Sequence, residues 1–300
     1  MSEKVLRASD YPSLTYSKIR DYVSLTKPRL LYSVLFSTAL GFVLPQDNLI
    51  TFLPLVYLLL GTAFTGGGAH ALNQWMETIP DSKMSRTKCR ALPMGRVSRN
   101  EALIFGIITV ILGITTLWLA LNILTAAIGC LTLVSYIFVY TPLKQRTIAN
   151  TWFGGITGAL PPVMGWTAAC NELNWEVIPI FALLYFWQLP HFFAIAWMYR
   201  QDYERSGFKM LSVVDHSGQR TAVQMLLNVF LLIISSISIY VIGQGSLLYL
   251  ISSFFLGLWF LLEIFYFWIE RSIVNSRKVF QTSIIYLLVL INILIFEQFF

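Results

Sequence analysis

The feature that most constrains this chain is a series of nine apolar runs. Each is near the ~20 residues that an α-helix needs to cross the hydrocarbon core of a bilayer. Backbone polar groups cannot be left unpaired in lipid, so such runs are expected to be helical. The sequence therefore predicts an all-α, polytopic membrane protein. The runs lie near 29–46, 49–72, 101–120, 123–141, 150–170, 176–198, 221–242, 245–269 and 280–299.

The composition agrees with a membrane protein. Hydrophobic residues make up 56% of the chain and charged residues only 12%, whereas about 25% is usual for soluble domains. We expect a polar cytoplasmic segment over 1–26, without the apolar stretch of a secretory signal, and a single transmembrane domain over 27–300. The three cysteines are scattered and predict neither a disulfide framework nor a zinc site.

The basic residues indicate the orientation of the predicted helices. If the nine runs alternate in direction, all 21 lysines and arginines fall on one side, in the N-terminal segment and in the connections after the second, fourth, sixth and eighth runs. By the positive-inside rule this predicts a cytoplasmic N-terminus and an outside C-terminus. A cytoplasmic N-terminus without a targeting peptide favours a bacterial inner (plasma) membrane. The net charge of +6 therefore indicates membrane topology and no nucleic-acid partner.

A polar stretch between the second and third runs, residues 73–93, carries the strongest functional pattern. Asn73 and Glu77 are four residues apart and share a helix face. Pro80 is expected to end or kink that helix just before Asp81. Mg²⁺ prefers carboxylate and carbonyl oxygens and often bridges substrate phosphates. We therefore predict a Mg²⁺–diphosphate site at Asn73, Glu77 and Asp81, the alternative being a loop with incidental acids. The cations expected to hold the remaining phosphate charge follow: Arg86, Lys88 and Arg90.

Two other polar stretches are candidates for the same site. After the sixth run, Asp202 is expected to bind a second Mg²⁺, with Arg200 or Lys209 pairing with phosphate. At the end of the fourth run, Lys144 is expected to add to the phosphate-binding rim, and Tyr140 to contact substrate. The alternatives are a solvated loop for the first stretch and topology anchors for the second.

Two histidines lie within apolar runs, where ionisable residues commonly mark function. Pro190 is expected to break the helix just before His191 and so to create part of a cavity wall. The double proline at 161–162 is likewise expected to distort its run. The imidazoles of His70 and His191 can bind iron, act as a base, or bond to a neighbouring helix, and the sequence leaves these roles open.

Six motifs together resemble the UbiA superfamily of intramembrane prenyltransferases, and the last three resemble its haem-farnesylating branch. The likeness covers about residues 20–298. The motifs are T-K-P-R (26–29), N-x-x-x-E-x-x-x-D-x-K-M-x-R-T (73–87), Y-T-P-L-K-x-R-T (140–147), G-A-L-P-P-x-x-G-W (158–166), P-H-F-F-A-I-A-W (190–197) and Y-R-x-D-Y-x-x-S-G-x-x-M-L-S-V (199–213).

The resemblance implies nine helices around a central cavity and Mg²⁺-dependent transfer of a farnesyl group from farnesyl diphosphate to a vinyl group of haem B, with addition of water. A haem A synthase or a terminal oxidase would use the product. The chain departs from the superfamily pattern at Glu77, where many members have Asp, and at Ser206, where another Asp is common. The second departure removes one acid from the expected second metal site.

Two other functions remain open at this point. The first is prenylation of an aromatic quinone precursor. The second is secondary transport, which intramembrane histidines and broken helices also fit. Transporters place their polar ligands near the middle of the bilayer, whereas here the acids and cations are predicted at one membrane face. That placement favours an enzyme that receives a diphosphate from the cytoplasm.

Overall fold

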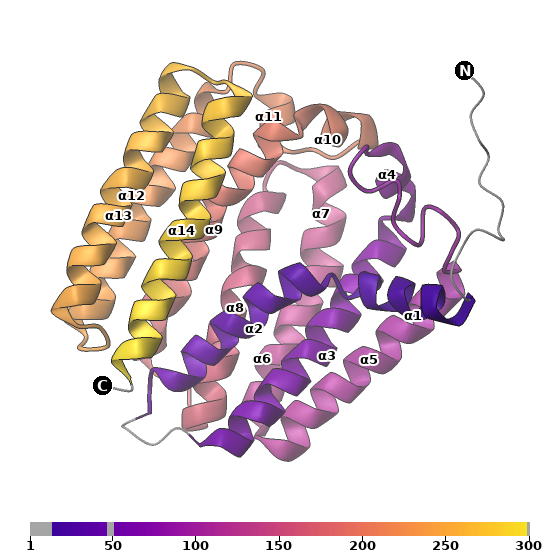
Figure 1. Ribbon diagram of the computed structural model, residues 1–300, viewed down its shortest axis with the longest axis horizontal. Coiled ribbons are helices and arrows are strands. Elements are labelled where there is room, and N and C mark those ends of the chain that lie inside the picture. Colours follow the sequence, from indigo (N-terminus) through magenta and orange to yellow (C-terminus); the bar gives the residue numbers. More distant parts are fainter. Residues whose placement is uncertain (1–13, 47–50, 299–300) are drawn as a thin grey trace.

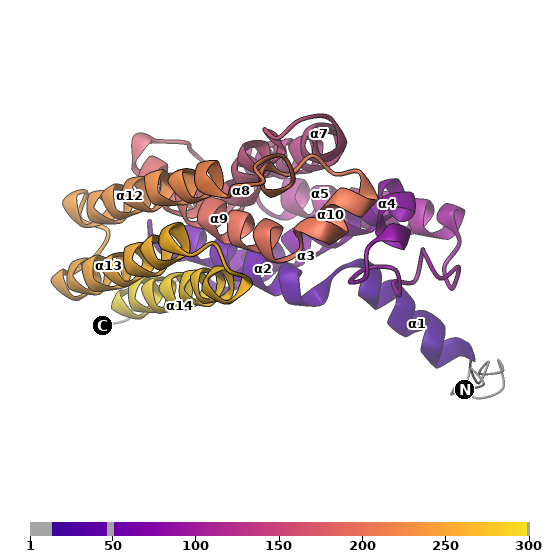
Figure 2. The ribbon, with the colours of Figure 1, turned by 90° about the horizontal axis from the view of Figure 1, so that it is seen from above.

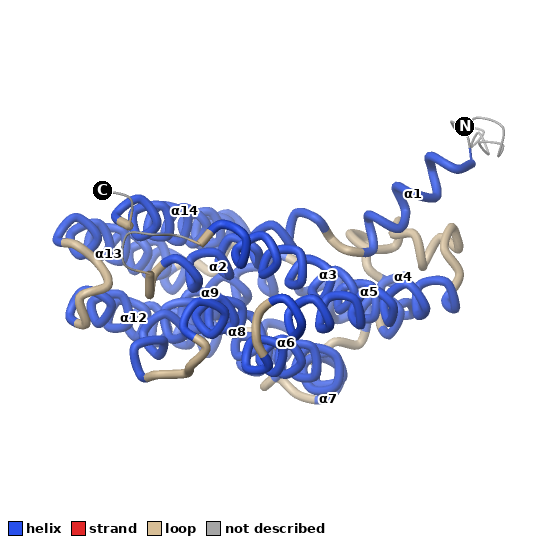
Figure 3. Tube along the Cα trace, turned by 90° about the horizontal axis from the view of Figure 1, so that it is seen from below, coloured by secondary structure: helices blue, strands red, loops and turns tan. Residues whose placement is uncertain are grey.

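The computed structural model describes residues 14–46 and 51–298, and every regular element among them is a helix (Figure 3). The predicted all-α class is confirmed. The first half of the predicted 1–26 segment, residues 1–13, lies outside the described residues. The second half contains α1 (Leu14–Leu25).

Each predicted apolar run coincides with a long helical segment in the described part of the chain. The fourth run is α6 followed without a break by the π-helix η2 and by α7. Seven segments are long and apolar enough to cross a membrane, while α2 is shorter and α8, rich in glycine and proline, is not among the seven. The long segments are α2 (Pro28–Val43), α3 (Phe52–Met76), α5 (Arg99–Ala120), α6 (Ile123–Val134) with η2 (Ser135–Tyr140) and α7 (Thr141–Arg146), α8 (Asn150–Cys170), α9 (Ile178–Met198), α12 (Gln219–Val241), α13 (Leu247–Ile269) and α14 (Ile273–Glu297).

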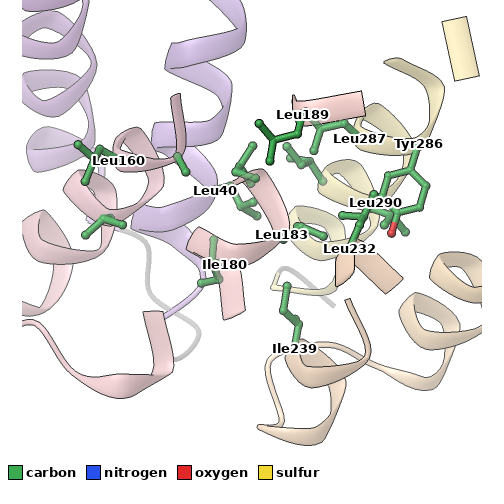
Figure 4. Packing of buried hydrophobic residues seen from close by; sticks show 14 of the residues in the cluster. Leu40, Leu160, Ile180, Leu183, Leu189, Leu232, Ile239, Tyr286, Leu287 and Leu290 are labelled. Atoms are coloured by element: carbon green, nitrogen blue, oxygen red, sulfur yellow. The ribbon is translucent and has the colours of Figure 1, made fainter. Parts of the chain in front are cut away.

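The long helices form two groups that meet along α2, α8 and α9. In Figure 1, α12, α13 and α14 lie on one side and α3, α5 and α6 on the other, with α2 packed against α8 and α9 against α12 and α14. Leu183 of α9, Leu232 of α12 and Leu290 of α14 are buried together in the shared core (Figure 4). The apolar faces of these helices therefore hold the two groups together.

The helices α8 and α9 run without interruption through their prolines, which corrects the expected distortion and break. In α8 the prolines lie at a close helix contact. A Cβ added at Gly41 of α2 would lie 1.9 Å from the carbonyl oxygen of Pro162, and one added at Gly165 would lie 2.1 Å from that of Thr38. Small residues allow such close approach of two backbones, so α2 and α8 pack tightly there.

The short helices gather at one end of the bundle. Between α3 and α5 lies α4 (Thr78–Lys83), and between α9 and α12 lie α10 (Arg200–Ser206) and α11 (Leu211–Val214), all at the top of Figure 1. There α10 packs against α4. The fold thus joins the two long polar connections, and α1 extends away from the bundle beside them (Figure 2). The 3-10 turn η3 (Trp175–Val177) precedes α9.

Candidate metal and diphosphate site

The three predicted metal ligands lie at the junction of α3 and α4. Asn73 is in the last turn of α3, Glu77 is the residue between the two helices, and Asp81 is in α4. Their exposed fractions are only 0%, 5% and 2%. The break falls at Glu77 and not at Pro80, which corrects the prediction. Pro80 lies in the first turn of α4, where a missing N–H breaks no helical hydrogen bond, and Asp81 is therefore on a helix instead of a loop.

Two of the ligands are paired with lysines from distant elements. The Nζ atom of Lys27 donates to Oδ1 of Asn73 at 2.9 Å, across 46 residues of sequence. The Nζ atom of Lys144, in α7, donates to Oε1 of Glu77 at 2.7 Å. The side chains of Lys144 and Glu77 are only 13% and 7% exposed, so this ion pair is poorly screened by solvent.

The third ligand is paired within its own connection. NH1 of Arg90 donates to Oδ2 of Asp81 at 2.7 Å, and the hydroxyl of Thr87 donates to the Asp81 carbonyl at 2.9 Å. The segment after α4 therefore folds back over Asp81. Arg90 was predicted as a phosphate ligand, and the structure places it beside Asp81, one of the predicted metal ligands.

Lys27 is a residue of the candidate site that sequence reasoning missed. The linker before α2 is tied to α3 at each step: Gln74 Nε2 donates to the Leu25 carbonyl and His70 Nδ1 bonds to the Thr26 carbonyl, both at 2.8 Å. Lys27 itself has a left-handed φ of 50°, which is uncommon for a residue with a side chain. The only sequence signal was its place in the T-K-P-R motif.

These contacts determine the environment of Lys27 and the part played by His70. Burial, reinforced by nearby Arg90 and Lys144, lowers the pKa of Lys27 to about 7. His70 is 6% exposed and uses Nδ1 to hold the linker that carries Lys27. Of the roles left open for His70, the structure shows a bond to a neighbouring segment.

The π-helix η2 brings a second set of side chains to the site. The hydroxyl of Thr141, directly after η2, accepts from Nδ2 of Asn73 at 3.1 Å and donates to the Tyr136 carbonyl at 2.8 Å. The ammonium of Lys144 lies 4.5 Å from the centre of the Tyr140 ring, a cation–π distance. Single turns of π-helix are frequent at functional sites, and this one orients Thr141 and Lys144 toward α3.

In the described part of the chain, the remaining predicted cations form no hydrogen bond or ion pair with Asn73, Glu77 or Asp81. The guanidinium of Arg86 lies 5.1 Å from the centre of the Tyr199 ring, and that of Arg200 lies 4.9 Å from the Trp197 ring. Lys88 and Lys209 are exposed. The main chain of Lys209 is nevertheless tied to the site region, because its N–H donates to the Lys144 carbonyl at 2.7 Å.

Asp202 forms its hydrogen bonds with residues other than the three candidate ligands and their cations. It accepts hydrogen bonds from Arg205, on its own helix, and from the backbone of Ser85. Burial alone would raise the pKa of Asp202, but these hydrogen bonds outweigh it and lower the pKa. In the described part of the chain no three His, Cys, Asp or Glu residues gather into a metal-binding group, so Asp202 does not join Glu77 and Asp81.

His191 lies between α9 and α14. Its Nδ1 is 2.7 Å from the hydroxyl of Ser283, and its ring centre lies 5.2 Å from that of Trp187 and 4.8 Å from that of Phe280. These contacts make His191 part of a helix interface. Two surface hollows, of about 490 and 500 Å³, are lined by residues outside the site.

The donor set fits Mg²⁺ and a diphosphate. Asn73, Glu77 and Asp81 offer hard oxygen atoms from buried positions, which Mg²⁺ prefers. Lys27, Lys144 and Arg90 surround them from three directions, and charge-assisted hydrogen bonds from such cations bind phosphate oxygens.

Two curated relatives are similar along most of the chain. The first, protoheme IX farnesyltransferase of Solibacter usitatus (strain Ellin6076), is 43% identical over 289 residues, covering 93% of this chain and 99% of the relative. The second, the mitochondrial protoheme IX farnesyltransferase of Arabidopsis thaliana, is 37% identical, covering 97% of this chain and 68% of the relative.

Solved structures share the fold. A structure of digeranylgeranylglyceryl phosphate synthase matches with a TM-score of 0.79 at 17% identity, covering 94% of this chain and 99% of that one. A UbiA homolog from Archaeoglobus fulgidus bound to DMAPP and Mg²⁺ matches with a TM-score of 0.71 at 15% identity, covering 93% and 99%. The family model for UbiA prenyltransferases matches residues 34–290. The chain belongs to the UbiA prenyltransferase family.

Proposed function

We propose that this chain transfers the farnesyl group of farnesyl diphosphate to a vinyl group of haem B, giving haem O. The carbon–oxygen bond to diphosphate breaks, and a carbon–carbon bond forms to the terminal vinyl carbon. The hydroxyl of a water molecule adds to the other vinyl carbon, and its proton is released. Diphosphate leaves with the electron pair of the broken bond.

The observation that carries this proposal is the 43% identity to a protoheme IX farnesyltransferase across nearly the whole chain. The site geometry supports it, because buried oxygen donors surrounded by cations fit a metal-bound diphosphate. The acids lie at the end of α3 and in α4, and α4 lies at one end of the helix bundle (Figure 1). A site at one end is less suited to the transporter alternative, in which ligands lie midway along the helices.

The cations are the chain's main contribution to bond cleavage. Negative charge develops on the diphosphate as the allylic carbon–oxygen bond breaks. Lys27, Lys144 and Arg90 are positioned to stabilise that charge, and positioned charge is commonly the largest catalytic contribution. Mg²⁺, when bound by Asn73, Glu77 and Asp81, would supply Lewis-acid stabilisation of the same oxygens.

Aromatic rings beside the cations can stabilise the other half of the reacting bond. Tyr136 and Tyr140 are stacked with ring centres 5.7 Å apart, and His70 packs edge-on against Tyr136 at 5.9 Å. The faces of such rings attract a carbocation. Because the farnesyl carbon becomes cationic where it leaves the diphosphate, we place that carbon next to Tyr140.

Further details extend the proposal. We propose that nine helices span the membrane around a central cavity, with the N-terminus in the cytoplasm of a bacterial cell and the bilayer enclosing the single domain. We assign Arg86, Lys88, Arg200 and Lys209 to diphosphate capture at the cytoplasmic face, and Asp202 to a second Mg²⁺. A haem A synthase or a terminal oxidase would consume the product.

Product analysis tests the function directly. Purified protein is incubated with Mg²⁺, farnesyl diphosphate and either haem B or 4-hydroxybenzoate, and the products are separated and weighed by liquid chromatography and mass spectrometry. We expect haem O from haem B and no prenylated benzoate. Prenylation of the benzoate without haem O would contradict the proposal and support the quinone-precursor alternative.

A further inference from the structure

We infer that Lys27, Lys144 and Arg90 act as internal counter-cations of the ligand cluster, so that the cluster accepts a divalent ion only together with a diphosphate. This inference rests on the proposed function and adds that the metal ion and the diphosphate bind together. The cations release the ligand oxygens when a diphosphate offers them a new partner.

The pairing between cations and ligands is one to one. Asn73 pairs with Lys27, Glu77 with Lys144, and Asp81 with Arg90, all at 2.7–2.9 Å. The three cations come from the linker before α2, from α7 and from the segment after α4. Because no cation is shared, a metal ion that binds the whole cluster meets a competitor at every ligand.

Competition is strongest at Asn73. A carboxylate keeps a second oxygen when one is hydrogen-bonded, but an amide has a single oxygen. The Oδ1 atom of Asn73 is taken by Lys27, and its Nδ2 is committed to Thr141. The amide is therefore held in one orientation by two partners, and a metal ion that used the remaining lone pair of its oxygen would be repelled at close range by the ammonium of Lys27.

The charge balance of the cluster also disfavours a metal ion alone. Two carboxylates form ion pairs with two cations, Lys144 and Arg90, and Lys27 lies beside the neutral amide, in a region where every ligand is buried. Adding a divalent cation to a cluster that is already neutralised is costly, because repulsion between charges is weakly screened away from water. A diphosphate supplies the negative charge that balances both the metal and the released side chains.

The linker before α2 allows the ammonium of Lys27 to move while its backbone stays fixed. Gln74 and His70 hold the carbonyls of Leu25 and Thr26, which fixes the backbone just before Lys27. The lysine stem has four flexible carbons and ends in a compact charge. The ammonium can therefore turn from Asn73 to a phosphate oxygen while the backbone stays in place, and His70 and Gln74 act as positioning residues.

Binding of Mn²⁺, used in place of Mg²⁺, tests the inference without a catalytic readout. Free Mn²⁺ is measured by electron paramagnetic resonance as the full chain in lipid nanodiscs is titrated, with and without farnesyl thiolodiphosphate, which resists cleavage. For the unmodified chain we expect the analogue to tighten Mn²⁺ binding by at least ~30-fold, and reciprocally Mn²⁺ to tighten analogue binding by the same factor.

The variant Lys27→Met is expected to tighten binding of Mn²⁺ alone by ~10-fold, because Oδ1 of Asn73 is released, and to shrink the effect of the analogue to below ~5-fold. Lys144→Met, which frees Glu77, should act in the same direction and serves if Lys27→Met does not fold. The control is Lys83→Met, which removes an exposed charge of α4 and should leave both affinities unchanged.

Unchanged affinity for Mn²⁺ alone in folded Lys27→Met and Lys144→Met would overturn the inference, as would tight binding of Mn²⁺ to the unmodified chain without the analogue. Haem O formation is assayed in the same preparations. Haem O without any coupling between Mn²⁺ and analogue refutes the counter-cations alone. Coupling without haem O refutes only the proposed acceptor.

Discussion

The two polar connections at the end of the bundle are built differently. In the first, residues 73–93, two of the three ligands are paired with lysines far away in sequence, Asn73 with Lys27 and Glu77 with Lys144. In the second, residues 199–213, Asp202 pairs with Arg205 on the same short helix.

This difference in pairing indicates how the two connections contribute to the candidate site. The ion pair between Asp202 and Arg205 can form wherever α10 forms, and among the described residues Asp202 is linked to the first connection only through hydrogen bonds from Ser85. The first cluster requires α3, α7 and the linker before α2 to be in place together. We therefore expect the chemistry to depend mainly on the first connection, while the second packs against it through Ser85, whose hydroxyl accepts from Arg205 at 3.1 Å.

The largest expected effect is on Asp81. Asp81→Asn keeps the size of the side chain but removes a buried charge that pairs with Arg90. We expect haem O formation to fall by about 10³-fold, near the upper range for loss of one electrostatic group in an active site. The rate is measured with purified protein at saturating substrates. A fall of less than tenfold in a folded sample would contradict the expectation that the chemistry depends mainly on the first connection.

A slightly smaller loss is expected for Lys144→Met. The ammonium balances Glu77 and is also positioned to stabilise the leaving diphosphate, so we expect kcat to fall by about 10²-fold. Steady-state kinetics with varied farnesyl diphosphate separate kcat from KM. A rise in KM with unchanged kcat would show that Lys144 contributes binding alone.

Asp202→Asn sharpens the comparison, because it places the same substitution in the second connection. Since Asp202 is paired locally, we expect a loss of about tenfold or less, within the smaller effects expected outside the main charge-stabilising group. The same haem O assay applies, run beside Asp81→Asn. Equal losses in the two variants would show that both connections share the metal ions evenly.

His191→Phe distinguishes packing from contact with haem. The structure uses the imidazole to bond Ser283 between α9 and α14, so we expect a stability loss of about 1 kcal/mol. Haem O formation should change by less than about threefold. The measurements are thermal unfolding and the absorption spectrum of added haem. A shifted haem spectrum in the variant would instead identify His191 as an iron ligand.

The smallest effect on activity is expected at Asp215, an acid that follows α11 and lies outside the site. Burial alone would raise its pKa, but hydrogen bonds from Thr221, Ser217 and Gly218 outweigh this and lower it. A lowered pKa gives stability that is present above the unfolded-state value, about 3.9, and is lost as the pH falls through the folded-state value.

We therefore expect Asp215→Asn to lower the melting temperature at neutral pH, with a difference from the unmodified chain that shrinks as the pH falls below about 4. Haem O formation at neutral pH should be unchanged. A melting difference independent of pH would show that the hydrogen bonds, and not the charge, stabilise the start of α12.

Hydropathy and charge predicted the helices well because both patterns depend on residues that are neighbours in the sequence. The run expected from 280 begins at Ile273 instead, since the first turns of α14 carry polar and charged residues that hide the helix from an apolar scan. The prolines of α8 and α9 misled the analysis for a different reason. Their local cost is outweighed by packing against other helices, such as Gly41 against Pro162.

The candidate site was predictable where its residues are neighbours in sequence. The regular spacing of four residues indicated that Asn73, Glu77 and Asp81 belong together, and Arg90 follows nine residues after Asp81. Lys27 could not be assigned in the same way, because its link to Asn73 spans 46 residues and depends on how α3 holds the linker. The T-K-P-R motif includes Lys27 but does not indicate that Asn73 is its partner.

The position of the metal tests the central claim most directly. A structure of the full chain with Mn²⁺ and farnesyl thiolodiphosphate, with the anomalous signal of Mn²⁺ recorded, locates the ion. We predict a Mn²⁺ peak about 2.0–2.3 Å from oxygens of Asn73 and Asp81, near the distances of hard cation–oxygen bonds, with Lys27 turned to the diphosphate. A Mn²⁺ peak on Asp202 alone, with the three pairs of the first connection intact, would contradict the account.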